Sequence, residues 1–145
     1  MIQVLIECDP VLESPIDNIV KEITDYILKN NDISAAEITI VFGQDRLLNK
    51  LKKLYFYKDE FTDVIAFRLN EYSNNYVEGE IYISLPRAKI NAKKYKDPYN
   101  KEIARLIIHG TLHLLGFEDK SKAKKVEMTE MEELYLKQVN WEGLL

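Results

Sequence analysis

Apolar and polar positions alternate with a period of two in four short stretches of the chain, and this period predicts strands. In the first stretch, Val4 and Ile6 share one side. The predicted strands span residues 2–8, 37–42, 63–69 and 79–85. A segment rich in turn-forming residues, 70–75, separates the last two strands, so we expect them to form a hairpin.

Apolar residues recur at helical spacing in the segments that lie between and after these strands. Helices are predicted over residues 14–30, 44–54, 87–96, 99–115 and 121–139. Pro15 suits the first turn of the first helix. Pro98 separates the third helix from the fourth, because proline lacks the N–H donor and restrains the residue before it.

This order of strands and helices, with no internal repeat or linker, predicts one α+β domain over residues 1–145. We expect a mixed sheet of about four strands packed against helices. The last helix carries apolar residues that we interpret as core packing rather than as a partner-binding stripe. These residues are Val126, Met128, Met131, Leu134 and Tyr135.

The composition limits both the compartment and the metal chemistry. With 46% hydrophobic residues among 145, the chain can bury one core, and no segment approaches the roughly 18 apolar residues that a membrane span requires. The first residues lack the basic, cleavable pattern of a signal peptide, so the cytoplasm is the expected location. Cys8 is the only cysteine, which excludes an internal disulfide and a thiolate cluster. Any metal ion would therefore be held by nitrogen and oxygen.

The net charge of −4 argues against a protein that binds nucleic acid over its whole surface. Charge is uneven, however, because five lysines lie between Arg87 and Arg105 against only Asp97 and Glu102. This stretch could offer a cationic face to phosphates. The alternative, which we favour on the charge pattern alone, is an ordinary solvated helix face.

His109 and His113 are the only histidines, and they lie four residues apart on a predicted helix. That spacing places both imidazoles on one helical face, an arrangement that binds zinc. Gly116 is placed to end the helix in a left-handed conformation, which brings Asp119 within reach as a third ligand. Glu118 is the alternative ligand, and both acids could instead cap the last helix.

Three protein ligands with an open fourth position are typical of a catalytic zinc site and indicate a hydrolase. The spacing alone also allows two histidines that merely pack beside a helix end. Gly110 follows the first histidine, where a metalloprotease helix carries its glutamate base, so peptide hydrolysis is disfavoured. Hydrolysis of a phosphodiester depends more on charge neutralisation and makes fewer demands on such a base.

Three segments of the chain resemble the YbeY endoribonuclease family, and the likeness runs in order over nearly the whole sequence. They are residues 62–67 (TDVIAF), 79–84 (GEIYIS) and 109–117 (HGTLHLLGF). The resemblance implies a mixed sheet with helices and a zinc-dependent, single-strand-specific endoribonuclease holding one ion per chain. It further implies a role in maturing the 3′ end of small-subunit rRNA and in ribosome quality control. Ribosomal proteins or assembly GTPases are further candidate partners.

The resemblance carries metal ligation over to His109 and His113. The family's third ligand is usually a histidine, and Asp119 stands at that position. A carboxylate is an acceptable zinc ligand, although its charge should make the ion a weaker Lewis acid. The family's YRxKD pattern reads YFYKD here, so Lys58 is kept while Phe56 replaces the arginine.

We predict Lys58 and Arg105 as catalytic residues. Arg105 lies one turn before His109, and Arg68 follows a predicted strand, so either could replace the missing arginine. For each arginine the alternative is an ordinary surface or salt-bridged residue. Phe56 could stack on unpaired bases or cover a core edge.

Smaller roles are expected elsewhere in the motifs. Thr62 and Asp63 are expected to shape the cleft, and Ser84 has no free histidine with which to form a nucleophilic dyad. A second hypothesis for the whole chain is a non-catalytic ribosome-assembly factor with a structural metal. The altered third ligand and the missing arginine favour this second hypothesis more than in a typical family member.

Overall fold

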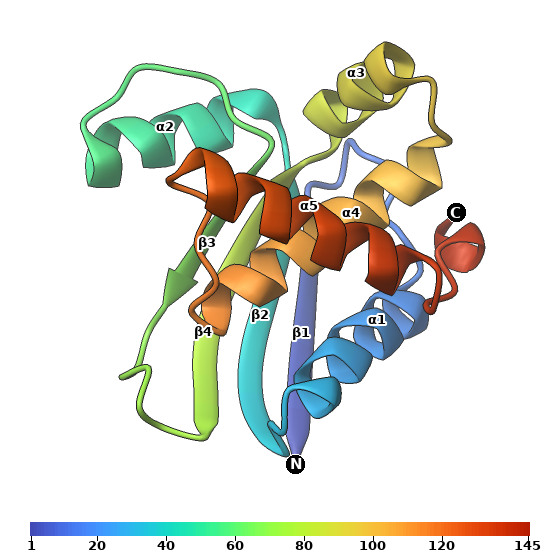
Figure 1. Cartoon of the computed structure of the whole chain (residues 1–145). Coiled ribbons are helices and arrows are strands. Elements are labelled where there is room, and N and C mark those ends of the chain that lie inside the picture. Colours follow the sequence, from blue (N-terminus) through green and yellow to red (C-terminus); the bar gives the residue numbers. More distant parts are fainter.

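Four strands form one mixed sheet in the order β1-β2-β4-β3 in the computed structural model, which describes residues 1–145 (Figure 1). The strands β1 (Ile2–Cys8), β2 (Ala35–Gly43) and β4 (Tyr76–Ser84) are parallel. The edge strand β3 (Val64–Arg68) is antiparallel to β4. The predicted α+β class and the predicted hairpin are confirmed.

Helices cover one face of the sheet, while most of the other face is open, with Leu5 of β1 56% exposed. The five helices are α1 (Asp17–Asn30), α2 (Asp45–Phe56), α3 (Leu85–Tyr95), α4 (Tyr99–Leu114) and α5 (Lys122–Leu136), and a short turn η1 (Glu142–Leu144) follows them. Helices α1 and α4 lie on one face, and α5 packs on the outer side of α4 (Figure 1). The end of α2 lies on the other face, where Tyr55 and Phe56 pack on Phe67.

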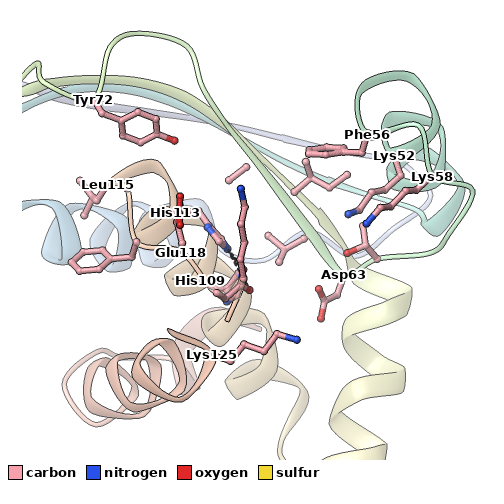
Figure 2. A pocket seen from close by; sticks show the side chains of 18 residues that line it. Lys52, Phe56, Lys58, Asp63, Tyr72, His109, His113, Leu115, Glu118 and Lys125 are labelled. Carbon is pink, nitrogen blue, oxygen red and sulfur yellow. Dashed lines mark hydrogen bonds and ion pairs between the residues drawn. The ribbon is translucent and has the colours of Figure 1, made fainter. Parts of the chain in front are cut away.

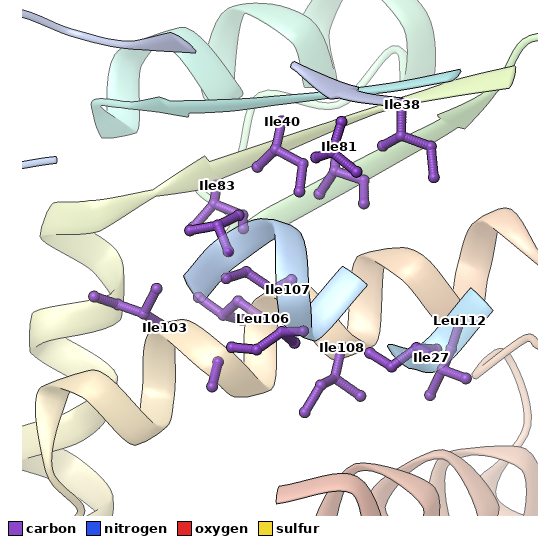
Figure 3. Packing of buried hydrophobic residues seen from close by; sticks show 14 of the residues in the cluster. Ile27, Ile38, Ile40, Ile81, Ile83, Ile103, Leu106, Ile107, Ile108 and Leu112 are labelled. Atoms are coloured by element: carbon purple, nitrogen blue, oxygen red, sulfur yellow. The ribbon is translucent and has the colours of Figure 1, made fainter. Parts of the chain in front are cut away.

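Helix α4 is the centre of the hydrophobic core. The side of β2 and β4 that faces it carries isoleucines, and α4 presents a matching set of isoleucines and leucines (Figure 3). These buried residues are Ile38, Ile40, Ile81, Ile83, Ile103, Leu106, Ile107, Ile108 and Leu112. Burying each such side chain stabilises the fold by about 1.5–3 kcal/mol, so α4 is held firmly against the sheet.

Gly110 allows this helix to approach the sheet unusually closely. A Cβ atom at this position would lie 2.6 Å from Cγ2 of Ile81. A side chain of any kind at residue 110 would therefore push α4 away from β4. The sheet-facing side of α4 is thus committed to packing, and a neighbouring side carries His109 and His113.

The boundaries of several elements differ from the predictions for local reasons. Helix α1 begins at Asp17 rather than near Pro15, because Ile16 is extended and its N–H donates to the carbonyl of Leu144. Helix α3 begins two residues early, since the Ser84 side chain accepts a hydrogen bond from the Arg87 N–H and caps it. Strand β4 begins three residues early because it pairs with β2 along its whole length.

Helix α5 packs through only one side, because it forms the outer layer. Met128 and Tyr135 are buried, and Met131 is partly buried against the core, as predicted. Val126 and Leu134 are exposed, so the prediction of core packing is wrong for these two residues. None of the helices combines the length and apolar character that crossing a bilayer requires.

Candidate metal centre

His109 and His113 project from α4 into a cleft of about 1040 Å³ at the β3 edge of the sheet (Figure 2). Their Nε2 atoms lie 3.0 Å apart. Gly116 ends the helical segment with φ +97°, as its position predicted, and the chain turns back toward the histidines. Asp119 then places one carboxylate oxygen 3.5 Å from His109 Nε2 and the other 3.6 Å from His113 Nε2.

These three side chains fit a metal ion. One ligand atom from each lies within 4.8 Å of the others. Four ligands around a tetrahedral ion with bonds of about 2.0–2.1 Å stand about 3.3 Å apart, close to the separations measured here. Three protein ligands leave one position open toward the cleft. Glu118, the alternative ligand, instead pairs with Lys124 at 3.2 Å.

His109 has a second partner behind the cleft. Its Nδ1 atom lies 2.5 Å from Oε2 of Glu132, a side chain of α5 that is only 4% exposed. A carboxylate on Nδ1 leaves Nε2 as the free nitrogen that faces His113 and Asp119. Glu132 is therefore part of the site although the sequence analysis did not identify it.

Burial lowers the pKa of His113, and the nearby His109 lowers it further, while Asp119 acts in the opposite direction. A lowered pKa keeps this imidazole neutral at pH 7, and the neutral form is the one that binds metal ions. The electrostatics of the site thus favour ligation by His113 over protonation.

Arg105 does not line the cleft. Its Nε donates to Glu102 Oε1 at 2.8 Å, its Nη2 pairs with Glu102 Oε2, and its Nη1 donates to Glu132 Oε1 at 3.3 Å. Burial alone would lower the pKa of Arg105, but the hydrogen bonds and charges of Glu102 and Glu132 raise it above its ordinary value. The placement supports the salt-bridged alternative and gives no support to contact between Arg105 and a substrate.

Arg68 also lies away from the ligands. Its guanidinium donates to the carbonyl of Leu114 at 2.7 Å and to carbonyls of the β3–β4 turn, among them those of Glu71 and Asn74. It therefore ties this turn to the end of α4. Tyr72 from the same turn lies beside Gly116 and lines the cleft.

The cleft has two walls of different origin. We call His109, His113 and Asp119 the ligand wall. Lys52, Phe56 and Lys58, from the end of α2 and the residues after it, form the lysine wall, and Figure 2 shows both lysines reaching into the cleft opposite the histidines.

Further charged groups border the cleft. Lys120 and Lys125 line it beside the ligand wall. Lys52 pairs with Glu60 at 3.4 Å, whereas Lys58, Lys120 and Lys125 form no salt bridge. The cleft thus offers three unpaired cations although the whole chain carries a net charge of −4. Such cations suit a phosphate backbone.

Phe56 combines the two roles that the sequence left open. Its ring stacks on Phe67 at 6.0 Å and so covers the sheet edge, and it also lines the cleft. Lys52 lies over the same ring at 4.7 Å. Thr62 and Asp63 line the cleft as expected. The Ser84 hydroxyl donates to Asp45 Oδ1 at 2.6 Å and accepts from the Arg87 N–H, so it has a capping role rather than a nucleophilic one.

The lysines between Arg87 and Arg105 lie outside the cleft. Arg87 pairs with Asp45 at 2.7 Å, and Lys101 pairs with Asp97 at 3.5 Å. The cationic border of the cleft comes instead from two segments far apart in the sequence, which carry Lys52 with Lys58 and Lys120 with Lys125.

The residues that sequence reasoning missed are buried or partly buried polar side chains on helices α3, α4 and α5. Glu102 and Glu132 are 1% and 3% exposed, and Asn91 donates to Glu102 at 3.1 Å. A signal for Glu132 existed, because it lies four residues after Met128 and three before Tyr135, on the same apolar side of its helix. A charged residue on an apolar stripe indicates a buried partner.

Comparisons with known proteins identify the family of the chain. The model of the family "Endoribonuclease YbeY" matches residues 6–140. The endoribonuclease YbeY of Chloroherpeton thalassium is 43% identical over 124 residues, covering 86% of each chain. The endoribonuclease YbeY of Flavobacterium psychrophilum is 36% identical over 129 residues, covering 84% of this chain and 90% of that protein.

A solved structure is similar as well. The solution structure of TM1509 from Thermotoga maritima superposes with a TM-score of 0.64 at 27% identity, and the match covers 94% of this chain and 88% of the other. The resemblance seen in the three sequence segments is confirmed, and with it the prediction of a hydrolase of the endoribonuclease class. The chain belongs to the endoribonuclease YbeY family.

Proposed function

We propose that this protein is a zinc-dependent endoribonuclease that cleaves single-stranded RNA. We further propose that it matures the 3′ end of small-subunit rRNA and takes part in ribosome quality control. The observation that carries the proposal is the convergence of His109, His113 and Asp119 in a cleft bordered by unpaired lysines. Family membership supports RNA as the substrate.

In this proposal His109, His113 and Asp119 hold one zinc ion per chain, with the open position directed into the cleft. When bound, the ion supplies Lewis-acid activation of water and of the phosphate. Asp119 contributes a negative charge that a third histidine would not, so the ion is held firmly but acts as a milder Lewis acid.

The other residues of the cleft bind and orient the RNA. Lys58 lies in the lysine wall without a salt-bridge partner, so its ammonium group is free to hold a phosphate of the scissile strand. Phe56, Tyr72 and Phe117 expose aromatic rings to the same cleft. Stacking requires unpaired bases, so these rings favour a single-stranded substrate.

The geometry favours catalysis over a purely structural metal. Structural zinc sites usually have four protein ligands, whereas this site has three and an open side. A peptidase is disfavoured more strongly, because Gly110 packs on Ile81 and offers no base. The proposed role places the protein in the cytoplasm, where Cys8 stays reduced, with ribosomal proteins or assembly GTPases as candidate partners.

The test joins metal analysis of the purified protein to cleavage of a labelled single-stranded RNA. Wild type should contain about one zinc ion per chain. The His113→Ala variant should lose metal and about 10³-fold in cleavage rate, because metal catalysis contributes several kcal/mol. Asp119→Ala should also lose metal, and Glu130→Ala, which removes an exposed acid of α5, should match wild type.

Two results would contradict the proposal. Full cleavage by metal-free protein or by His113→Ala would reject the metal mechanism. Bound metal together with slow, metal-independent cleavage and co-sedimentation with small-subunit particles would favour the non-catalytic assembly factor.

A further inference from the structure

A chain of buried and partly buried polar side chains lies behind the ligand wall, between helices α3, α4 and α5. It begins at His109, passes through Glu132 and Arg105 to Glu102, and continues to Asn91. The two glutamates are almost completely buried. A buried charge is costly unless it is paired and hydrogen-bonded, so the positions of these side chains are closely constrained.

The contact between Glu132 and His109 fixes how the imidazole carries its proton. An ionised carboxylate only accepts hydrogen bonds, so Nδ1 of His109 must donate to Glu132 Oε2 at 2.5 Å. The lone pair is then on Nε2, which lies 3.0 Å from His113 Nε2 and 3.5 Å from Asp119 Oδ2. Only this tautomer presents a metal-binding nitrogen to the other two ligands.

Glu132 is itself held at both oxygens. Oε2 contacts His109, while Oε1 accepts from Arg105 Nη1 at 3.3 Å. Arg105 cannot swing away, because both oxygens of Glu102 bind it. Every member of the network has its partners, and a fully satisfied buried network holds its side chains rigidly.

The charges of the network suit a divalent cation. Glu102 and Glu132 carry two negative charges and Arg105 one positive charge, which leaves one negative charge buried behind His109. Asp119 adds a second on the ligand wall. The network also reaches the cleft at its other end, because Asn91 donates to Asp63 at 2.9 Å.

We propose that Glu132, held in place by Arg105 and Glu102, is a positioning residue that fixes the Nδ1–H tautomer of His109 and thereby sets the affinity of the site for its metal ion. This inference rests on the metal site of the proposed function. In this inference Arg105 acts by holding Glu132 in place and does not contact the RNA.

The decisive variant is Glu132→Gln, which keeps the shape of the side chain but removes its charge. Its amide can donate to Nδ1 and so stabilise the wrong tautomer. Zn²⁺ affinity, measured by competition with a chromophoric chelator, should fall about 10- to 100-fold, as is typical when a carboxylate partner of a metal-binding histidine is lost. Glu133→Gln is the matched control, because Glu133 is the exposed neighbour on the same helix.

A second readout needs neither metal nor RNA. In metal-free protein, ¹⁵N NMR of the imidazoles should show His109 protonated at Nδ1 in wild type and in Glu133→Gln, and shifted toward Nε2–H in Glu132→Gln. Cooperative unfolding of Glu132→Gln would show that the variant is folded, so a change of tautomer could not be ascribed to a general loss of structure. Should Glu132→Gln fail to fold, Arg105→Lys provides the same two measurements, with a smaller loss of Zn²⁺ affinity expected.

The outcomes separate this inference from the proposed function. If Glu132→Gln binds Zn²⁺ as tightly as Glu133→Gln and keeps the wild-type tautomer, the positioning role is rejected while the metal site stands. If Arg105→Lys is used in place of Glu132→Gln, unchanged Zn²⁺ affinity and an unchanged tautomer reject the positioning role in the same way. Wild-type protein that binds no Zn²⁺ would overturn both the metal site and the inference.

Discussion

The two walls of the cleft are built in opposite ways. Behind the ligand wall, the buried Glu132 and the partly buried Arg105 hold His109 in a single orientation. In the lysine wall, Lys52 pairs only with Glu60, whose side chain is half exposed, and the exposed Lys58 has no salt-bridge partner. Exposed pairs of this kind contribute about 0–1 kcal/mol, so nothing comparable fixes the lysine wall.

This difference matches what each wall must do. Metal ligands have to keep their positions to within about half an ångström, which requires partners that are themselves immobile. A wall that accepts a flexible strand of RNA gains from side chains that can adjust. The three predictions below test this contrast, from the largest expected effect on stability to the smallest.

Removing the charge of Arg105 should cause the largest loss. Arg105→Gln leaves Glu102 and Glu132 buried without their cation, which should lower the free energy of unfolding by about 3–5 kcal/mol. Lys101→Gln, which breaks the more exposed pair with Asp97, should cost less than about 1 kcal/mol. Urea denaturation measures both. Equal losses in the free energy of unfolding would show that the network around Arg105 is no more important for stability than an exposed ion pair.

Filling the close contact between α4 and the sheet should cost less. Gly110→Ala places a methyl group against Ile81, and the overpacking outweighs the better helix propensity of alanine, for a net loss of about 1–2 kcal/mol. Thermal unfolding measures it. The double variant with Ile81→Ala should lose less than the sum of the two single variants, since the contact is then absent. A stabilised Gly110→Ala would contradict the packing described for α4.

Changing the lysine wall should affect RNA binding and leave stability almost unchanged. Lys58→Ala should alter the free energy of unfolding by no more than about 0.5 kcal/mol, because the side chain is exposed. Its RNA affinity should fall, and the slope of log affinity against log salt concentration should decrease by about 0.7 for the lost phosphate contact. Lys137→Ala, at the far end of α5, is the control. An unchanged slope would show that Lys58 does not contact an RNA phosphate.

The fold class and the convergence of the three candidate ligands were accessible from the sequence because both depend on short-range spacing. His109 and His113 share a helical face whatever the rest of the chain does, and Gly116 lets the chain return with Asp119. The hairpin of β3 and β4 also follows from local patterns and the 70–75 turn, whereas the order β1-β2-β4-β3 depends on long-range pairing and was not predicted.

The network behind His109 was not accessible in the same way. Arg105 was assigned because it lies one turn before His109 on α4, but α5 covers this turn, and Glu102 and Glu132 bind the guanidinium. Glu132 comes from that other helix, 23 residues away in the chain. Only the packing of α5 on α4 brings them together, and no spacing in the sequence encodes that packing.

The contact of Gly110 with Ile81 also limits how the protein can move. A helix seated this closely on a strand cannot slide along it without first lifting off, and Leu114 adds a second such contact over Gly79. Shear motions of α4 are therefore blocked. A widening of the cleft would therefore come from the segments that border it, such as the one between α2 and β3, while α4 keeps its place on the sheet.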